Sequence, residues 1–109
     1  MLVESVTAPP PAGCKQIRLT KGLCTIVDAD LYNELNRYYW RAVRSFSRFY
    51  AVREIRIKGG YRTIRMHRQV AKTPGDRICH HKNGNTLDNR RANLANITDY
   101  LHRKLYSWR

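Results

Sequence analysis

Histidine chemistry is concentrated in the last third of the chain. Residues 78–90 read ICHHKNGNTLDNR, so His80 and His81 are adjacent, and His102 follows further along. A neutral imidazole can ligate a borderline divalent ion, and it can also take up a proton near neutral pH as a general base. Two interpretations are open: solvated surface histidines beside a turn, or a paired metal ligand and base.

The elements around these histidines decide whether they can meet. The sequence predicts a strand at 77–81, a polar loop at 82–92, a strand at 93–97 and a helix at about 99–107, capped by Thr98 or Asp99. If the two strands pair as a hairpin, the helix folds back across them and brings His102 close to one histidine of the pair. Neighbouring side chains of a strand point to opposite faces, so the other histidine is available as a base.

The preceding part of the chain is rich in strand signals. Lys21-Gly22 and Lys58-Gly59-Gly60 interrupt β-branched and aromatic runs and mark hairpin turns. Asp28 or Asp30 is expected to cap a short amphipathic helix. The expected elements are a hairpin within 15–27, a helix at 29–38, strands at 40–45, 49–57 and 61–66, and a short helix at 67–71. The fold class is therefore α+β, with a small N-terminal antiparallel sheet.

Charge points to a polyanionic partner. The chain has 21 Lys and Arg against 8 Asp and Glu, a formal net charge of +13, and such a field attracts nucleic acid. An anionic membrane surface is a weaker candidate. Four arginines are expected on the predicted strands: Arg53, Arg56, Arg62 and Arg65. Each alone could be simply solvated, but as a set they favour a sheet face that contacts DNA.

Other compositional features exclude several protein classes. Cys14, Cys24 and Cys79 form no CxxC pair, which favours a reducing intracellular compartment and argues against a cysteine-based zinc site. No segment approaches the ~20 apolar residues of a membrane span, and the N-terminus does not resemble a secretory signal. We therefore expect a cytoplasmic protein whose residues 1–14, which include TAPPPAG, form a flexible leader.

The run HHKNGNTLDNRRANL followed by His102 resembles the HNH, or ββα-metal, nuclease motif, most closely that of phage and mobile-intron homing endonucleases. The upstream segments IRLTKGLCTIVDADLYNELNRYYW, YAVR and Met66-His67-Arg68 are similar to the N-terminal region of the same family, which resembles the plant Apetala-type DNA-binding sheet. The resemblance covers about residues 15–109. It implies a β-rich DNA-binding region at 15–72 and a ββα-metal unit at 73–109.

The resemblance also implies roles for individual residues. His81 matches the general base, while His80 and His102 match the two metal-ligand positions. Asn93 matches the central Asn, which ties the loop to the backbone of the catalytic histidine. The loop residues Asn83, Gly84, Asp88 and Asn89 are implied to be structural, as is His67.

One departure from the family pattern concerns the metal. His80 stands where the family usually has an aspartate, which removes a negative charge and favours softer ions such as Zn²⁺, Ni²⁺ or Co²⁺ over Mg²⁺. Adjacent histidines also resemble the arrangement in bacteriocin DNases of the HNH group. Those enzymes carry a further helical histidine where this chain has Tyr106. The expected cofactor is one divalent ion, with Mg²⁺, Mn²⁺, Ni²⁺ and Zn²⁺ as candidates.

The sequence thus predicts a metal-dependent endonuclease acting on double-stranded DNA. The alternative is a DNA-binding protein that retains the fold with a degenerate site, and a structured-RNA binder is a weaker third hypothesis. Cutting both strands requires either a second active site, as in a homodimer, or sequential action of one site. The sequence shows no pattern that marks a dimer interface.

Overall fold

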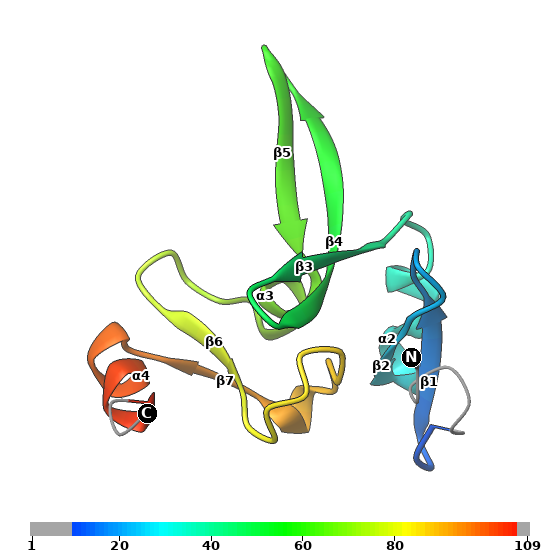
Figure 1. Cartoon of the computed structure of the whole chain (residues 1–109). Helices are drawn as coiled ribbons and strands as arrows, with labels where there is room; N and C mark the ends of the chain where they lie inside the picture. Colours follow the sequence, from blue (N-terminus) through cyan, green and yellow to red (C-terminus); the bar gives the residue numbers. More distant parts are fainter. Residues whose placement is uncertain (1–9, 107–109) are drawn as a thin grey trace.

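The protein, represented by a computed structural model, is described over residues 10–106 (Figure 1). Most of the leader predicted for residues 1–14 lies outside this range. Its last residues form a turn in which the Cys14 amide donates to the Pro11 carbonyl at 3.1 Å. Among the described residues, no helix is long and apolar enough to cross a membrane.

The fold is α+β, as the sequence predicts, and its strands form three separate antiparallel sheets. The N-terminal region therefore contains two sheets, a hairpin and a three-stranded sheet, where one small sheet was expected. The elements in chain order are β1 (Cys14–Arg18), β2 (Cys24–Asp28), α2 (Ala29–Leu35), β3 (Arg41–Ser45), β4 (Arg48–Ile57), β5 (Gly60–Arg65), α3 (Met66–Ala71), β6 (Ile78–His81), a 3-10 turn (Arg91–Asn93), β7 (Leu94–Ile97) and α4 (Asp99–Tyr106).

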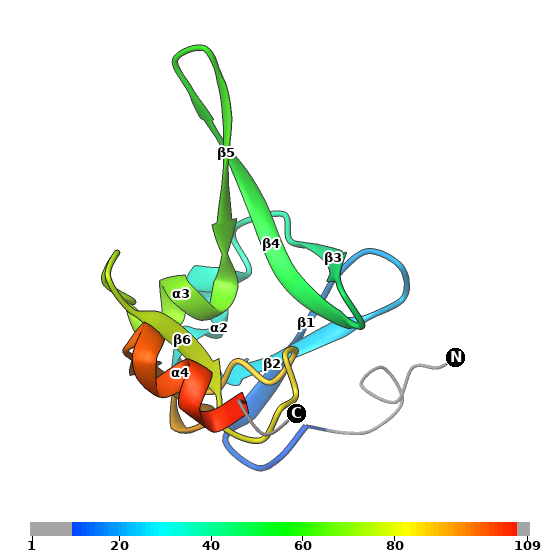
Figure 2. The same cartoon turned by 60° about the vertical axis from the view of Figure 1, so that its left-hand side comes forward.

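The β4–β5 hairpin extends from the body of the protein as an arm (Figures 1 and 2). Its last pair is Ile57 with Gly60, and Gly59 has a φ of +89°, which a glycine adopts without the strain that a Cβ would add. The arm's outer residues have little around them to bury, since Ile57 and Tyr61 are both exposed. The arm is thus a projecting two-stranded ribbon, anchored only at its base.

The core joins the two halves of the chain. Trp40, Val27 and Met66 are fully buried at its centre, and Trp40 Nε1 donates to the Leu35 carbonyl at 2.7 Å. Leu87, from the polar loop between β6 and β7, packs into the same cluster. The loop also pairs with the edge of β2: the Ile26 amide donates to the Leu87 carbonyl at 2.9 Å, and the Asn89 amide donates to the Ile26 carbonyl at 2.8 Å. The regions 15–72 and 73–109 therefore share one core.

The helix caps follow the prediction at one helix and depart from it at another. Thr98 Oγ1 accepts the Leu101 amide at 3.1 Å and caps α4. Asp28 occupies the N-cap position of α2, but its side chain makes no capping bond there. Its Oδ2 accepts the Arg91 amide at 2.8 Å instead, and Arg91 also pairs with Asp30 at 2.8 Å. The expected cap is therefore wrong, because these carboxylates hold the 3-10 turn before β7 against the hairpin.

Candidate active site

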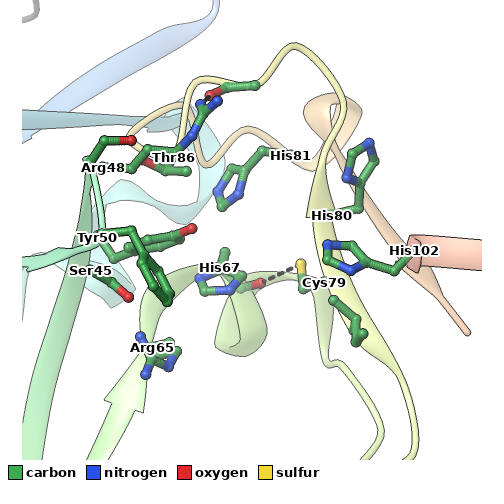
Figure 3. Close-up of a pocket in the computed structure, with 14 residues that line it drawn as sticks. Ser45, Arg48, Tyr50, Arg65, His67, Cys79, His80, His81, Thr86 and His102 are labelled. Carbon is green, nitrogen blue, oxygen red and sulfur yellow. Dashed lines mark hydrogen bonds between the residues drawn. The ribbon is translucent and has the colours of Figure 1, made fainter. Parts of the chain in front are cut away.

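Strand β6 directs its two histidines to different surroundings. His81 pairs with Leu94 and is buried, whereas His80 pairs with Ala95 and is partly exposed. Figure 3 shows His80 next to His102, and His81 lying toward Thr86, His67 and Tyr50. Strand alternation therefore separates the doublet as predicted.

His80 and His102 come together because α4 folds back along β6. Their ring centroids lie 6.3 Å apart, with the ring planes at 76°. Two imidazoles bound to one ion through nitrogens at about 2.0–2.1 Å have centroids no more than ~6.5 Å apart, and roughly 5 Å apart in tetrahedral geometry. At 6.3 Å the two rings lie near the upper limit of this range, so a shared tetrahedral ion would require them to move closer together.

Few of the described side chains near His80 and His102 could serve as ligands for a metal ion. Among residues 10–106, no group of three or more His, Cys, Asp and Glu side chains is arranged to hold a metal ion. His80 and His102 would therefore supply only two protein ligands, both neutral nitrogens. Such a set suits a borderline ion whose other positions are filled by water or phosphate.

The orientation of His81 is fixed by a buried hydrogen-bond chain that begins on β2. Thr25 Oγ1 donates to the Leu87 carbonyl at 2.8 Å, and it accepts from Asn89 Nδ2 at 2.9 Å. The amide oxygen of Asn89 therefore faces His81, whose Nε2 lies 2.8 Å away. Because an amide oxygen can only accept, Nε2 of His81 must carry the proton. The chain thus assigns Nδ1 as the basic nitrogen of the neutral ring.

The protonation state of His81 follows from the same surroundings. Burial lowers the pKa of His81 below its ordinary value, partly opposed by the Asn89 hydrogen bond and the Asp88 carboxylate. A lowered pKa leaves the imidazole neutral at pH 7. A neutral imidazole with a defined lone pair is the form that a general base requires.

His67 and Tyr50 belong to the site, although the sequence did not place them there. The His67 ring lies 4.9 Å from that of His81, and Tyr50 lies 5.6 Å from His67 and 6.2 Å from His81. Burial lowers the pKa of His67 to about 3, with nearby His81 and the cationic Arg65 and Arg68 acting in the same direction, so His67 is a neutral ring at the floor of the site. The Cys79 thiol donates to the His67 carbonyl at 3.4 Å and joins α3 to β6. The sequence signals were the family-like segments YAVR, which begins with Tyr50, and Met66-His67-Arg68.

The polar loop is braced by its own side chains. The Gly84 amide donates to the His81 carbonyl at 3.0 Å, with Gly84 at a φ of +77°. Asn83 Nδ2 donates to Asp88 Oδ2 at 3.0 Å, and Arg90 donates to both Asp88 oxygens at 2.7 and 2.6 Å. These donors keep the pKa of the Asp88 carboxyl lowered although burial opposes them. These hydrogen bonds brace the loop, and Asn89 also contacts His81.

Asn93 braces the loop through both its side chain and its backbone. It is buried; its Oδ1 accepts the Asn83 amide at 3.0 Å, and its Nδ2 donates to the Asp88 carbonyl at 2.9 Å. It therefore ties the two ends of the loop together. The Gly84 amide holds the His81 carbonyl, and the backbone carbonyl of Asn93 accepts the Lys82 amide at 2.8 Å, so Asn93 also holds the peptide group that follows His81.

A cavity of about 570 Å³ opens over these residues (Figure 3). All four histidines line it, together with Tyr50, Arg48 and Arg65. Arg48 donates to the Gly84 carbonyl, and the Arg65 guanidinium lies 6.0 Å from the Tyr50 ring centroid. The described lining holds two arginines and no carboxylate, so the cavity is chemically suited to an anion.

The four strand arginines do not share one face. Pairing places Arg53 opposite Ile64 and Arg62 opposite Ile55, whereas Arg56 is opposite Tyr61 and Arg65 opposite Val52. Because side chains alternate along β4, the first two lie on one face and the last two on the other. Only Arg65 reaches the cavity.

Arg53 is mainly a packing residue. Its guanidinium lies 3.8 Å from the Tyr38 ring centroid and 5.5 Å from that of Trp40, and it donates to Gln69 Oε1 at 3.2 and 3.1 Å. These contacts leave its side chain partly buried. The guanidinium is therefore committed to the base of the arm, whereas Arg56 and Arg62 lie exposed further along it.

No family model, no curated protein and no solved structure matches the chain.

Proposed function

We propose that the protein is a metal-dependent endonuclease of the HNH type that hydrolyses DNA phosphodiester bonds. The observation that carries the proposal is that β6 places its two adjacent histidines in different surroundings. His80 meets His102 at a distance that a shared ion allows, while buried His81 has its proton fixed on Nε2 by Asn89. A solvated surface doublet would show neither feature.

The chemistry follows from the positions of these groups. Nδ1 of His81 takes a proton from the water that attacks the scissile phosphorus, and Asn89 steadies the imidazolium that forms. Arg48 and Arg65 attract the phosphate into the cavity and balance its charge. A divalent ion held by His80 and His102 would supply stabilisation of the charge that develops on the phosphate and on the leaving oxygen.

The arm supplies the binding surface in this proposal. Its exposed Arg56 and Arg62 lie on opposite faces of a two-stranded ribbon, and a ribbon of this kind can enter the major groove of duplex DNA. The formal charge of +13 adds sequence-independent attraction. Cys14, Cys24 and Cys79 are free thiols, which supports an intracellular setting. A homodimer is one route to cutting both strands.

A plasmid-nicking assay with Mg²⁺, Mn²⁺, Ni²⁺ and Zn²⁺ tests the proposal. We expect at least one ion to support cleavage by the parent protein. His81→Ala should reduce the rate by ~10²–10⁴ while leaving DNA affinity nearly intact, since the general base contributes about that much. If His81→Ala cut DNA as fast as the parent, the assigned base would be wrong.

A DNA-binding protein with a degenerate site is the second candidate. It is favoured by one observation: His80 and His102 would supply only two neutral ligands at the cavity, and no third ligand joins them among residues 10–106. Tight, salt-sensitive binding of DNA without cleavage at any of the four ions would support this candidate over the nuclease.

A further inference from the structure

The β3–β4 turn presents an aromatic residue that folding does not explain. Phe46 is 98% exposed, so its ring gains almost nothing from packing. Its backbone has a φ of +57°, a left-handed conformation that glycine or asparagine adopts more easily than phenylalanine. Phe46 therefore neither buries its ring nor occupies a backbone conformation that phenylalanine favours.

The turn is held in a fixed place beside the candidate active site. Arg48 donates to the Gly84 carbonyl, and Thr86 Oγ1 donates to the Phe49 carbonyl, so both contacts join the start of β4 to the polar loop. Arg44 Nε donates to the Phe46 carbonyl at 3.0 Å and steadies the turn itself. Phe46 also lines the cavity that holds the histidines.

The surroundings of Phe46 indicate the chemistry of its partner. Arg44 and Arg48 flank the turn, Arg65 lies across the cavity, and the cavity lining contains no carboxylate. An exposed aromatic ring among guanidinium groups suits a ligand that carries both anionic groups and flat apolar rings. A nucleic-acid strand has this combination, with bases that stack on aromatic side chains and phosphates that pair with arginine.

We propose that Phe46 stacks on a base of the bound DNA strand next to the phosphate in the cavity, and so sets the position of that strand relative to His81. The proposal rests on the proposed function in taking DNA as the ligand and the cavity as its phosphate site. Stacking of one base on an aromatic side chain changes affinity on the order of tenfold. Because stacking neutralises no phosphate, it leaves the salt dependence of binding unchanged.

The test compares Phe46→Gly with the parent in binding to a mixed-sequence DNA duplex that carries a short unpaired stretch, with a chelator present so that no cleavage occurs. Affinity should fall roughly tenfold, with the same slope of log affinity against log salt. Melting temperature should be equal or higher, because glycine suits the φ of this turn. Tyr39→Gly is the matched control: Tyr39 is 76% exposed and does not line the cavity, so affinity should hold.

A second pair of variants reports stacking directly. Phe46→Trp should retain the parent's affinity, and its added emission should be quenched when duplex DNA binds. Tyr39→Trp should show no such quenching. Unchanged affinity in Phe46→Gly, or equal quenching at the two positions, would overturn the proposal, as would absence of DNA binding by the parent. If Phe46→Gly lost only the ability to self-associate, the stacking proposal would also be overturned. Phe46 would then belong to a contact between copies of the protein.

These outcomes separate the proposal from the nuclease function. If the parent binds DNA through Phe46 but cleaves with no ion, the stacking contact stands and the hydrolytic function fails. If the parent cleaves DNA and Phe46→Gly binds and cleaves equally well, the nuclease stands and the stacking contact fails.

Discussion

Acidification should weaken the fold through His67, and glutamine at this position should remove the effect. His67 is 7% exposed and lies against His81, so protonation would place a charge in the floor of the site. Burial lowers its pKa from an ordinary 6.5 to about 3. Between these values the unfolded chain binds a proton at this position and the folded protein does not. The stability that His67 contributes as a neutral ring is therefore complete above pH 6.5 and is lost as the pH falls toward 3.

The size of the effect follows from the same two values. One bound proton gives a slope of about 1.4 kcal/mol per pH unit in the free energy of unfolding. Lowering the pH from neutral to about 4.5 should therefore remove on the order of 2–3 kcal/mol through His67 alone. This range lies above the titration of most carboxylates, which limits their contribution. For a small domain, that loss is a large fraction of the total stability.

Urea unfolding between pH 7.5 and 4.5 measures the effect, with a chelator present to exclude metal binding. The parent and His67→Gln are compared by the slope of unfolding free energy against pH, so a constant destabilisation by the substitution does not matter. The lowered pKa values of His80 and His81 act in both proteins. The parent's slope should exceed that of His67→Gln by about 1 kcal/mol per pH unit. Equal slopes would refute the assignment of His67 as a buried neutral imidazole.

Four further substitutions test separate parts of the site and the arm. Thr25→Val removes the acceptor of Asn89 Nδ2, so unfolding free energy should fall by about 1–3 kcal/mol, measured by urea denaturation, and nicking should slow because Asn89 can then rotate. His102→Ala should weaken binding of Ni²⁺ or Zn²⁺ in calorimetric titration without altering the circular dichroism spectrum; unchanged metal affinity would contradict the proposed ligand pair. Arg62→Ala should lower the salt slope of DNA binding by about 1 at unchanged melting temperature. Arg53→Ala should instead lower the melting temperature, because Arg53 packs at the base of the arm; the reverse pattern would show that their roles are exchanged.

The sequence predicted the local structure well because its signals are local. Glycines at the turns, β-branched runs and the polar loop gave the order of elements from β1 to α4, with small differences at their ends. Strand alternation separated His80 from His81, since the two-residue period of a strand does not depend on the rest of the fold. Thr98 caps α4 for the same reason, as the bond joins residues three apart.

Other features depended on contacts between distant parts of the chain. Asp28 was expected to cap α2, yet its carboxylate binds the Arg91 amide, which only the docking of the loop on the hairpin brings near. The strand arginines were taken as one face, although alternation alone separates Arg53 from Arg56, three residues away on β4. The pairing register decides that Arg53 shares its face with Arg62, and the fold packs Arg53 against Tyr38. A register is set by partners on another strand, so the sequence of one strand does not reveal it.

The sequence by itself determined the histidines, the loop that braces them and the positive charge of the chain. The tertiary structure decided which nitrogen of His81 carries the proton and which residues surround that ring. The proton on His81 Nε2 is assigned by Asn89 and Thr25, and Thr25 lies on β2, far away in sequence. His67 reaches His81 only when α3 packs against β6. Burial and hydrogen-bond direction set the protonation of an imidazole, and both are properties of the folded chain.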